Sequence, residues 1–129
     1  MALLSEFLSR CRPILCAAVL FAAPPALSQT FFHAIEDLPV APGLTESVDE
    51  GVSFDSPGGR IVTAIARGAG DMAAYRRFYA DALPPLGWKR QDGGGYRRDG
   101  EALSLDFNRR GAGVEMRVRV VPTGSEKAR

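Results

Sequence analysis

Three acidic residues, Glu101, Asp106 and Glu115, lie on segments with a strand-like pattern, and two carboxylates flanking a sugar could hydrolyse a glycosidic bond. That chemistry needs one carboxyl group whose pKa is raised by burial in a cleft. The pattern indicates the opposite, because Asp106 acquires a basic partner across the strands and Glu115 alternates with arginines. The sequence therefore predicts no catalytic residue, and a hydrolase is the least favoured function.

Other side chains that attack substrates or bind metals are scarce. The chain of 129 residues has two cysteines and one histidine. Cys11 and Cys16 precede the expected start of the mature protein, and His33 lies in an extended N-terminal segment. A catalytic triad or a zinc site needs several such residues that converge, so the sequence predicts no metal and no cofactor.

Arginine is the residue type best suited to binding a partner, because its guanidinium captures phosphates and carboxylates through two parallel hydrogen bonds. From residue 29 onward, 12 of the 14 basic residues are arginines. The pairs at 97–98 and 109–110 are separated by a strand of roughly 25 Å, so they predict a distributed anionic partner rather than one small anion. The candidate face consists of Arg109, Arg110, Arg117 and Arg119.

The charges are divided unevenly along the chain. Residues 29–55, the acidic leader, contain six acids and no base, whereas residues 56–129 contain 14 bases and eight acids. One interpretation is that the basic body binds an anionic partner. The favoured one is that the leader lies along the body and neutralises it, since oppositely charged neighbours in one chain commonly compensate each other.

Length and composition bound the remaining possibilities. A chain that is 46% hydrophobic and 24% charged predicts a single small domain, and its net charge of +1 argues against nucleic acid as partner.

Arg10 and Arg12 precede an apolar run at 14–23, two prolines and the small-residue site Ala26-Leu27-Ser28. This is typical of a secretory signal peptide (1–28) cleaved after Ser28, which predicts a periplasmic or secreted protein without a transmembrane span in the mature form. An uncleaved anchor is the alternative, although ten apolar residues fall short of a span.

The first part of the expected mature chain has no sustained period. Prolines interrupt the apolar residues of 29–50, which predicts an extended strap laid across the domain. Residues 52–55 and 60–66 then alternate around a Ser-Pro-Gly-Gly turn and predict a hairpin. In the self-consistent register Asp55 faces Arg60, Phe54 faces Ile61 and Val52 faces Thr63.

One segment has helical spacing. Asp71 is a good N-cap, apolar residues recur from Met72 to Leu83, and Pro84-Pro85 predicts an end near Leu83. An aromatic stripe of this kind is usually the core face of a helix lying on a sheet. The alternative is a pocket for a small apolar or amphipathic ligand between helix and sheet, lined by Tyr75, Tyr79 and Trp88.

The rest of the chain alternates as strands. Residues 88–91 and 96–98 flank three glycines, and an odd-length loop would place Trp88 and Tyr96 on one face. In residues 101–108 and 114–120, matching the apolar faces sets Phe107 against Met116, Leu105 against Val118 and Asp106 against Arg117. Pro122 ends the last strand, and 123–129 are expected to form a disordered tail.

Together these elements predict a two-layer α+β domain at 51–122. Its antiparallel sheet has five or six short strands with one helix on one face, in the order β-β-α-β-β-β-β. The other face is polar and open.

The run from Phe78-Tyr79 through Leu83 and Gly87-Trp88 to the last hairpin, within residues 51–121, resembles small uncharacterised bacterial secreted or envelope proteins. In these an aromatic helix ends in Leu-Gly-Trp before a β-meander, and the resemblance brings no activity or site residue. The favoured function is an exported, non-enzymatic binding or structural module of the envelope, whose partner is an envelope protein or an anionic envelope component.

Overall fold

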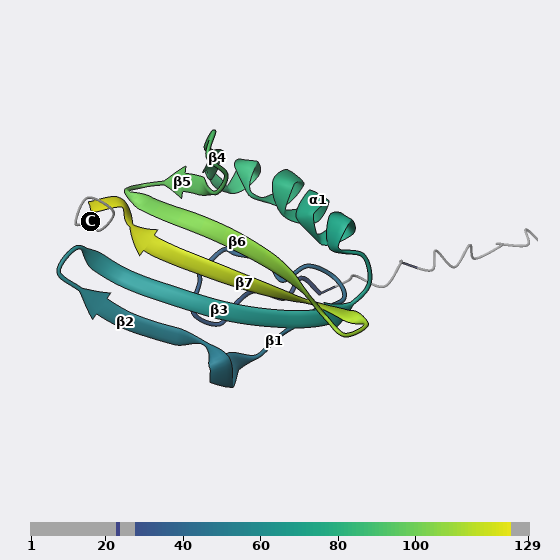
Figure 1. Cartoon of the computed structure of the whole chain (residues 1–129). Coiled ribbons are helices and arrows are strands. Elements are labelled where there is room, and N and C mark those ends of the chain that lie inside the picture. The colour runs from purple at the N-terminus through teal and green to yellow at the C-terminus, as the bar shows by residue number, and fades with distance from the viewer. Residues whose placement is uncertain (1–22, 24–27, 125–129) are drawn as a thin grey trace, which may run out of the picture.

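The computed structural model describes residue 23 and residues 28–124, which form an antiparallel sheet with a helix and the strap on one face (Figure 1). Its strands are β1 (Leu44–Glu46), β2 (Val52–Ser56), β3 (Gly59–Ala69), β4 (Lys89–Arg90), β5 (Tyr96–Arg98), β6 (Glu101–Arg110) and β7 (Gly113–Pro122). The helix α1 (Met72–Ala82) is accompanied by two short 3-10 helices, η1 (Val48–Glu50) and η2 (Pro84–Leu86). The expected signal peptide lies outside the described residues except for 23 and 28, as does the expected tail from 125 onward.

The predicted α+β class is confirmed, but the strand count and order were wrong. The described sheet has seven strands in the spatial order β1-β3-β7-β6-β5-β4, and β2 also pairs with β3. The additional strand is β1, which lies inside the segment expected to be a strap. Three residues are too few to show an alternating pattern, and β1 is formed by its pairing with β3.

Strands β1 and β2 together form one interrupted edge of the sheet. β1 pairs with residues 66–68 of β3 and β2 with residues 59–63, while β7 occupies the other side of β3. The helix η1 separates the two strands. The approach of β1 requires Gly68, because a Cβ there would lie 2.0 Å from the carbonyl oxygen of Gly43.

The registers predicted for the first and last hairpins are confirmed. Phe54 pairs with Ile61, and Asp106 pairs with Arg117. Each hairpin continues one pair further than expected, so that two-residue turns at 57–58 and 111–112 replace the four-residue loops. Short turns of this length suit the right-handed twist of paired strands.

The middle hairpin has the predicted odd-length loop, made of five residues rather than three. Arg90 pairs with Tyr96, and Lys89 lies opposite Arg97, so two like charges face each other across this hairpin. Trp88 and Tyr96 are both buried. Burial of these two large side chains therefore outweighs the repulsion between exposed charges.

The helix begins and ends as predicted. The Asp71 side chain accepts a hydrogen bond of 3.1 Å from the backbone N–H of Ala73, which caps the first turn. The helix ends at Ala82, followed by Leu83 as C-cap and the two prolines of η2. Tyr75, Tyr79 and Leu83 lie on its buried side.

The strap supplies the rest of the core. Its buried side chains are Phe32, Ile35, Leu38, Val40, Ala41 and Leu44. The Tyr79 hydroxyl donates a 2.9 Å hydrogen bond to the Pro39 carbonyl and accepts one of 3.1 Å from the Ala41 N–H. At the far side, Arg98 pairs with Asp37 at 3.6 Å, and its guanidinium lies over the Trp88 ring. Helix and strap thus cover one face of the sheet together.

We expect the change Tyr79→Phe to destabilise the mature protein by about 1–3 kcal/mol, because it leaves the buried N–H of Ala41 and the carbonyl of Pro39 without their partner. Urea denaturation measures this difference. Arg77→Ala, on the exposed side of the same helix, is the control and should stay within about 0.5 kcal/mol of the wild type. Equal stabilities of the two variants would contradict the role given to the hydroxyl.

Candidate functional site

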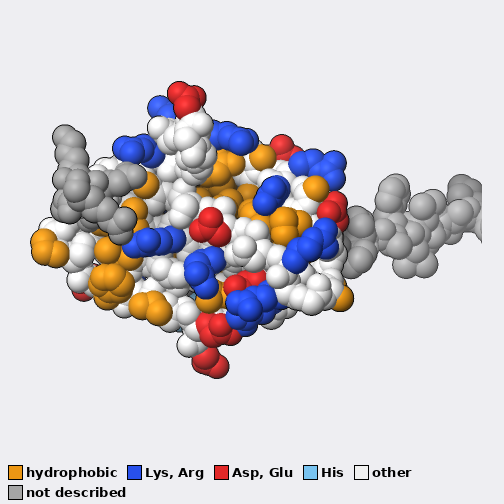
Figure 2. Space-filling model, viewed as in Figure 1, with side chains coloured by type: hydrophobic (Ala, Val, Ile, Leu, Met, Phe, Trp, Pro, Cys, Tyr) orange, Lys and Arg blue, Asp and Glu red, His pale blue; other side chains and the backbone are white. Residues whose placement is uncertain are grey.

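The face of the sheet opposite the helix and the strap is open. We call open face the surface formed by Ile61, Thr63, Ala102, Ser104, Asp106, Arg117, Arg119 and Val121. Strand alternation places these residues away from the core. Asp106 and Arg117 are exposed, whereas Val118, the next residue after Arg117, is buried. Figure 2 shows this side, with hydrophobic side chains gathered near the β2–β3 turn and basic ones spread over the remainder.

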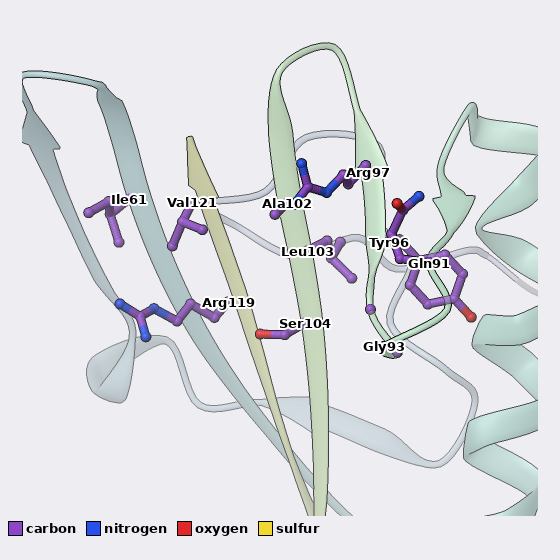
Figure 3. A pocket seen from close by; sticks show the side chains of 12 residues that line it. Ile61, Gln91, Gly93, Tyr96, Arg97, Ala102, Leu103, Ser104, Arg119 and Val121 are labelled. Carbon is purple, nitrogen blue, oxygen red and sulfur yellow. The ribbon is translucent and has the colours of Figure 1, made fainter. Parts of the chain in front are cut away.

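A hollow of about 850 Å³ lies on the open face (Figure 3). It extends from β3 across β7 and β6 to β5 and the loop that follows β4, a width of about 14 Å at the usual spacing of strands. Apolar side chains of Ile61, Val121 and Ala102 line it beside Arg119 and Ser104. The hollow therefore combines apolar contact surface with the guanidinium groups of Arg97 and Arg119.

Two of the four candidate arginines lie together on this face. Arg119 stands on β7 between Thr63 and Ser104 of the neighbouring strands, and Arg117 stands between Ile65 and Asp106. Both are exposed, and no ion pair formed by the described residues includes either. Their charges are available to a partner.

The other two candidates do not extend this pair. Arg110 is on the open face, but it is bound to Glu115 at 3.3 Å. Arg109 pairs in register with Val114, which places it on the opposite face of the sheet, where it is exposed. Of the four candidates, Arg117 and Arg119 thus lie outside the ion pairs of the described residues, Arg110 belongs to an ion network, and Arg109 lies on the other face.

A buried carboxylate organises the end of the open face near the β6–β7 turn. Glu115 is 2% exposed, and its Oε2 receives a 2.9 Å hydrogen bond from Nε of Arg67. Arg67 also binds Glu50 of η1, with 2.7 Å between Nη2 and Oε2. The hydrogen bond from Arg67 lowers the pKa of the Glu115 carboxyl below its ordinary value, and Arg110 acts in the same direction. Glu115 is therefore a structural anion with no tendency to act as a general acid.

The ion pairs connect the acidic leader with the basic body. Glu50 binds Arg67, and Asp37 binds Arg98. This agrees with the interpretation that the leader neutralises part of the body. Arg117 and Arg119 are not reached by it, so the neutralisation leaves a basic area on the open face.

The three aromatic residues proposed for a ligand pocket are brought together in the core. Tyr75, Tyr79 and Trp88 are all buried. Tyr75 donates its hydroxyl hydrogen to the Ala69 carbonyl, and Tyr79 is engaged by the strap. Burial raises the pKa of the Tyr79 phenol, so it remains protonated. The strap thus takes the contacts beside the helix that the pocket hypothesis assigned to a ligand, and the hollow lies on the other face.

Sequence reasoning anticipated the open face but missed its hollow. The hollow depends on the course of the β4–β5 loop, whose Gly93, Gly94 and Gly95 contribute to its wall. Gly94 and Gly95 have positive φ angles of 85° and 73°, and a Cβ on Gly95 would lie 2.9 Å from the Leu103 carbonyl oxygen. The run of three glycines was the only signal for this shape.

The chain matches no protein-family model, no curated protein and no solved structure. In the part of the chain that the structure describes, no helix is long and apolar enough to cross a membrane. Within the same residues, no group of three or more His, Cys, Asp and Glu side chains could hold a metal ion. The assignment of function therefore depends on the open face itself.

The change Glu115→Gln should lower stability at pH 7 and flatten the loss of stability in acid. The folded pKa of Glu115 lies below the ordinary value of 4.5, so its stabilisation is complete above that pH and disappears as the pH falls through the folded pKa. Urea denaturation between pH 7 and pH 3 measures both effects. Arg109→Gln, outside the network, should keep the wild-type slope, and an unchanged slope in Glu115→Gln would refute the assignment.

Proposed function

We propose that this chain is an exported, non-enzymatic interaction module that binds an acidic partner protein of the bacterial envelope through the open face of its sheet. The observation that carries the proposal is the pair Arg117 and Arg119, exposed beside the hollow and outside every ion pair of the described residues. Guanidinium groups in this position are suited to bidentate capture of carboxylates.

The shape of the open face favours a protein segment over a small molecule or a bilayer. The hollow is wide and open, whereas sites for small molecules usually enclose most of the ligand. A flat membrane surface could not enter a hollow, but a helix or loop could. Ile61 and Val121 would then bury apolar side chains of the partner while Arg119 binds its acids.

Export is supported by the sequence alone. The basic residues, apolar run and small-residue site of 1–28 are those of a secretory signal peptide. The resemblance of residues 51–121 to small secreted or envelope proteins points in the same direction. We place the mature chain in the periplasm or outside the cell on these grounds.

Replacing Arg117 and Arg119 together with serine should weaken salt-sensitive binding of the partner by roughly 2- to 30-fold, because each exposed ion pair contributes about 0.2–1 kcal/mol. The test immobilises residues 29–129 and captures envelope proteins of the source organism at low and high salt. Bands lost at high salt from the wild type should be depleted with the double variant.

The matched control removes two charges outside the open face, by Arg77→Ser and Arg109→Ser. Circular dichroism melts confirm that all variants are folded. If the open-face variant captures the same proteins in the same amounts as the wild type and the control, the proposed binding surface is wrong.

A further inference from the structure

Strand β2 leaves one side of its backbone without a partner among the described strands. It pairs only with β3, and Figure 1 shows it at the margin of the sheet with no labelled element beyond it. An edge strand points the N–H and C=O groups of alternate residues away from its neighbour. Val52, Ser53, Phe54 and Asp55 are all exposed. The backbone of β2 can therefore accept a further strand.

The side chains of β2 would favour such an addition. Val52 is 55% exposed and Phe54 52% exposed, and they lie two residues apart on the open face, opposite Thr63 and Ile61. A strand laid beside β2 would place its alternate side chains against this pair. Apolar residues at alternate positions would remove both from water.

Natural edge strands are commonly protected by lysine, proline or a bulge. β2 contains no lysine and no proline, and its five residues pair with β3 without a break in register. The proline of the β2–β3 hairpin stands in the turn, at position 57. Asp55 is the single charged residue of β2. The strand thus lacks these three protective devices.

The charge near this edge indicates the chemistry of the added strand. Asp49 and Asp55 are exposed, and no ion pair among the described residues includes either. The nearest basic residue in the sheet is Arg60, which lies opposite Asp55 on β3 and donates a 2.7 Å hydrogen bond from Nε to the Ser53 hydroxyl, so that Asp55 faces one cation. A second copy of this chain would bring its own acidic edge against these acids, which disfavours self-pairing. A basic strand would be attracted.

We propose that β2 binds an extended segment of a partner protein by strand addition, the segment carrying apolar residues at alternate positions and lysine or arginine between them. The binding strand is short, about 17 Å, because η1 interrupts the edge before Val52. Backbone hydrogen bonds hold the segment, and the Val52–Phe54 pair selects its apolar side. This site adjoins the basic open-face site at Ile61 and Thr63 and takes a segment of opposite charge.

The test uses a fluorescent heptapeptide, Lys-Val-Lys-Val-Lys-Val-Lys, and measures its binding to residues 29–129 by fluorescence anisotropy. A second peptide replaces the central valine with proline, which keeps the charge but removes a backbone donor and the strand conformation. We expect saturable binding of the first peptide and at least tenfold weaker binding of the second. Equal binding of the two would show that only charge is recognised and would overturn the proposal.

Variants of the protein locate the site. Phe54→Lys introduces an edge lysine and should abolish binding of the valine peptide, and Val52→Lys should do the same if the first variant folds poorly. The double variant Arg117→Ser, Arg119→Ser should bind it as the wild type does. Full binding by both folded lysine variants would exclude β2 as the site.

Self-pairing is the remaining outcome. Sedimentation of the wild type alone should show a monomer over the concentrations used. A dimer that Phe54→Lys abolishes would assign the edge to a second copy and would overturn the proposal. The result with the valine peptide does not depend on the acidic partner of the open face, so each proposal can fail without the other.

Discussion

The bond between the Tyr79 hydroxyl and the strap is the contact on which the arrangement of this fold depends. An 11-residue helix is only about 16 Å long, whereas the long strands of the sheet extend for about 35 Å. One helix therefore cannot cover the apolar side of the sheet. The strap completes the cover, and its buried backbone at Pro39 and Ala41 obtains hydrogen-bond partners from the tyrosine that the helix places in the core.

Because helix and strap lie on the same side, the other side of the sheet has no cover from the described residues. The charged and apolar groups that a partner could contact are consequently at the surface. Asp37 and Glu50 of the acidic leader form ion pairs with the body. The charged groups outside these ion pairs lie in two separate areas. A basic area remains at Arg117 and Arg119, and an acidic, apolar edge remains at β2. We propose that each of them binds a macromolecular partner.

The residues explain which parts of this structure were predictable. The last hairpin was predictable residue by residue because Leu105 and Val118 alternate with polar neighbours, and a slip of one position would expose them. β1 was not, since its pairing depends on a close approach at Gly68 that no periodicity records. The open face followed from alternation, and the same alternation in the predicted register places Arg109 opposite Val114, on the other face from Arg117. The hollow required the course of the glycine loop.

The most direct test of this account is the solvent accessibility of valine methyl groups in residues 29–129, measured by NMR as relaxation from a soluble paramagnetic probe. The account predicts weak relaxation for Val118 in the sheet and for Val40 in the strap, both buried, and strong relaxation for Val52 at the edge. If Val40 relaxes as strongly as Val52, the strap does not close the core. The division into a covered and an open face would then be wrong.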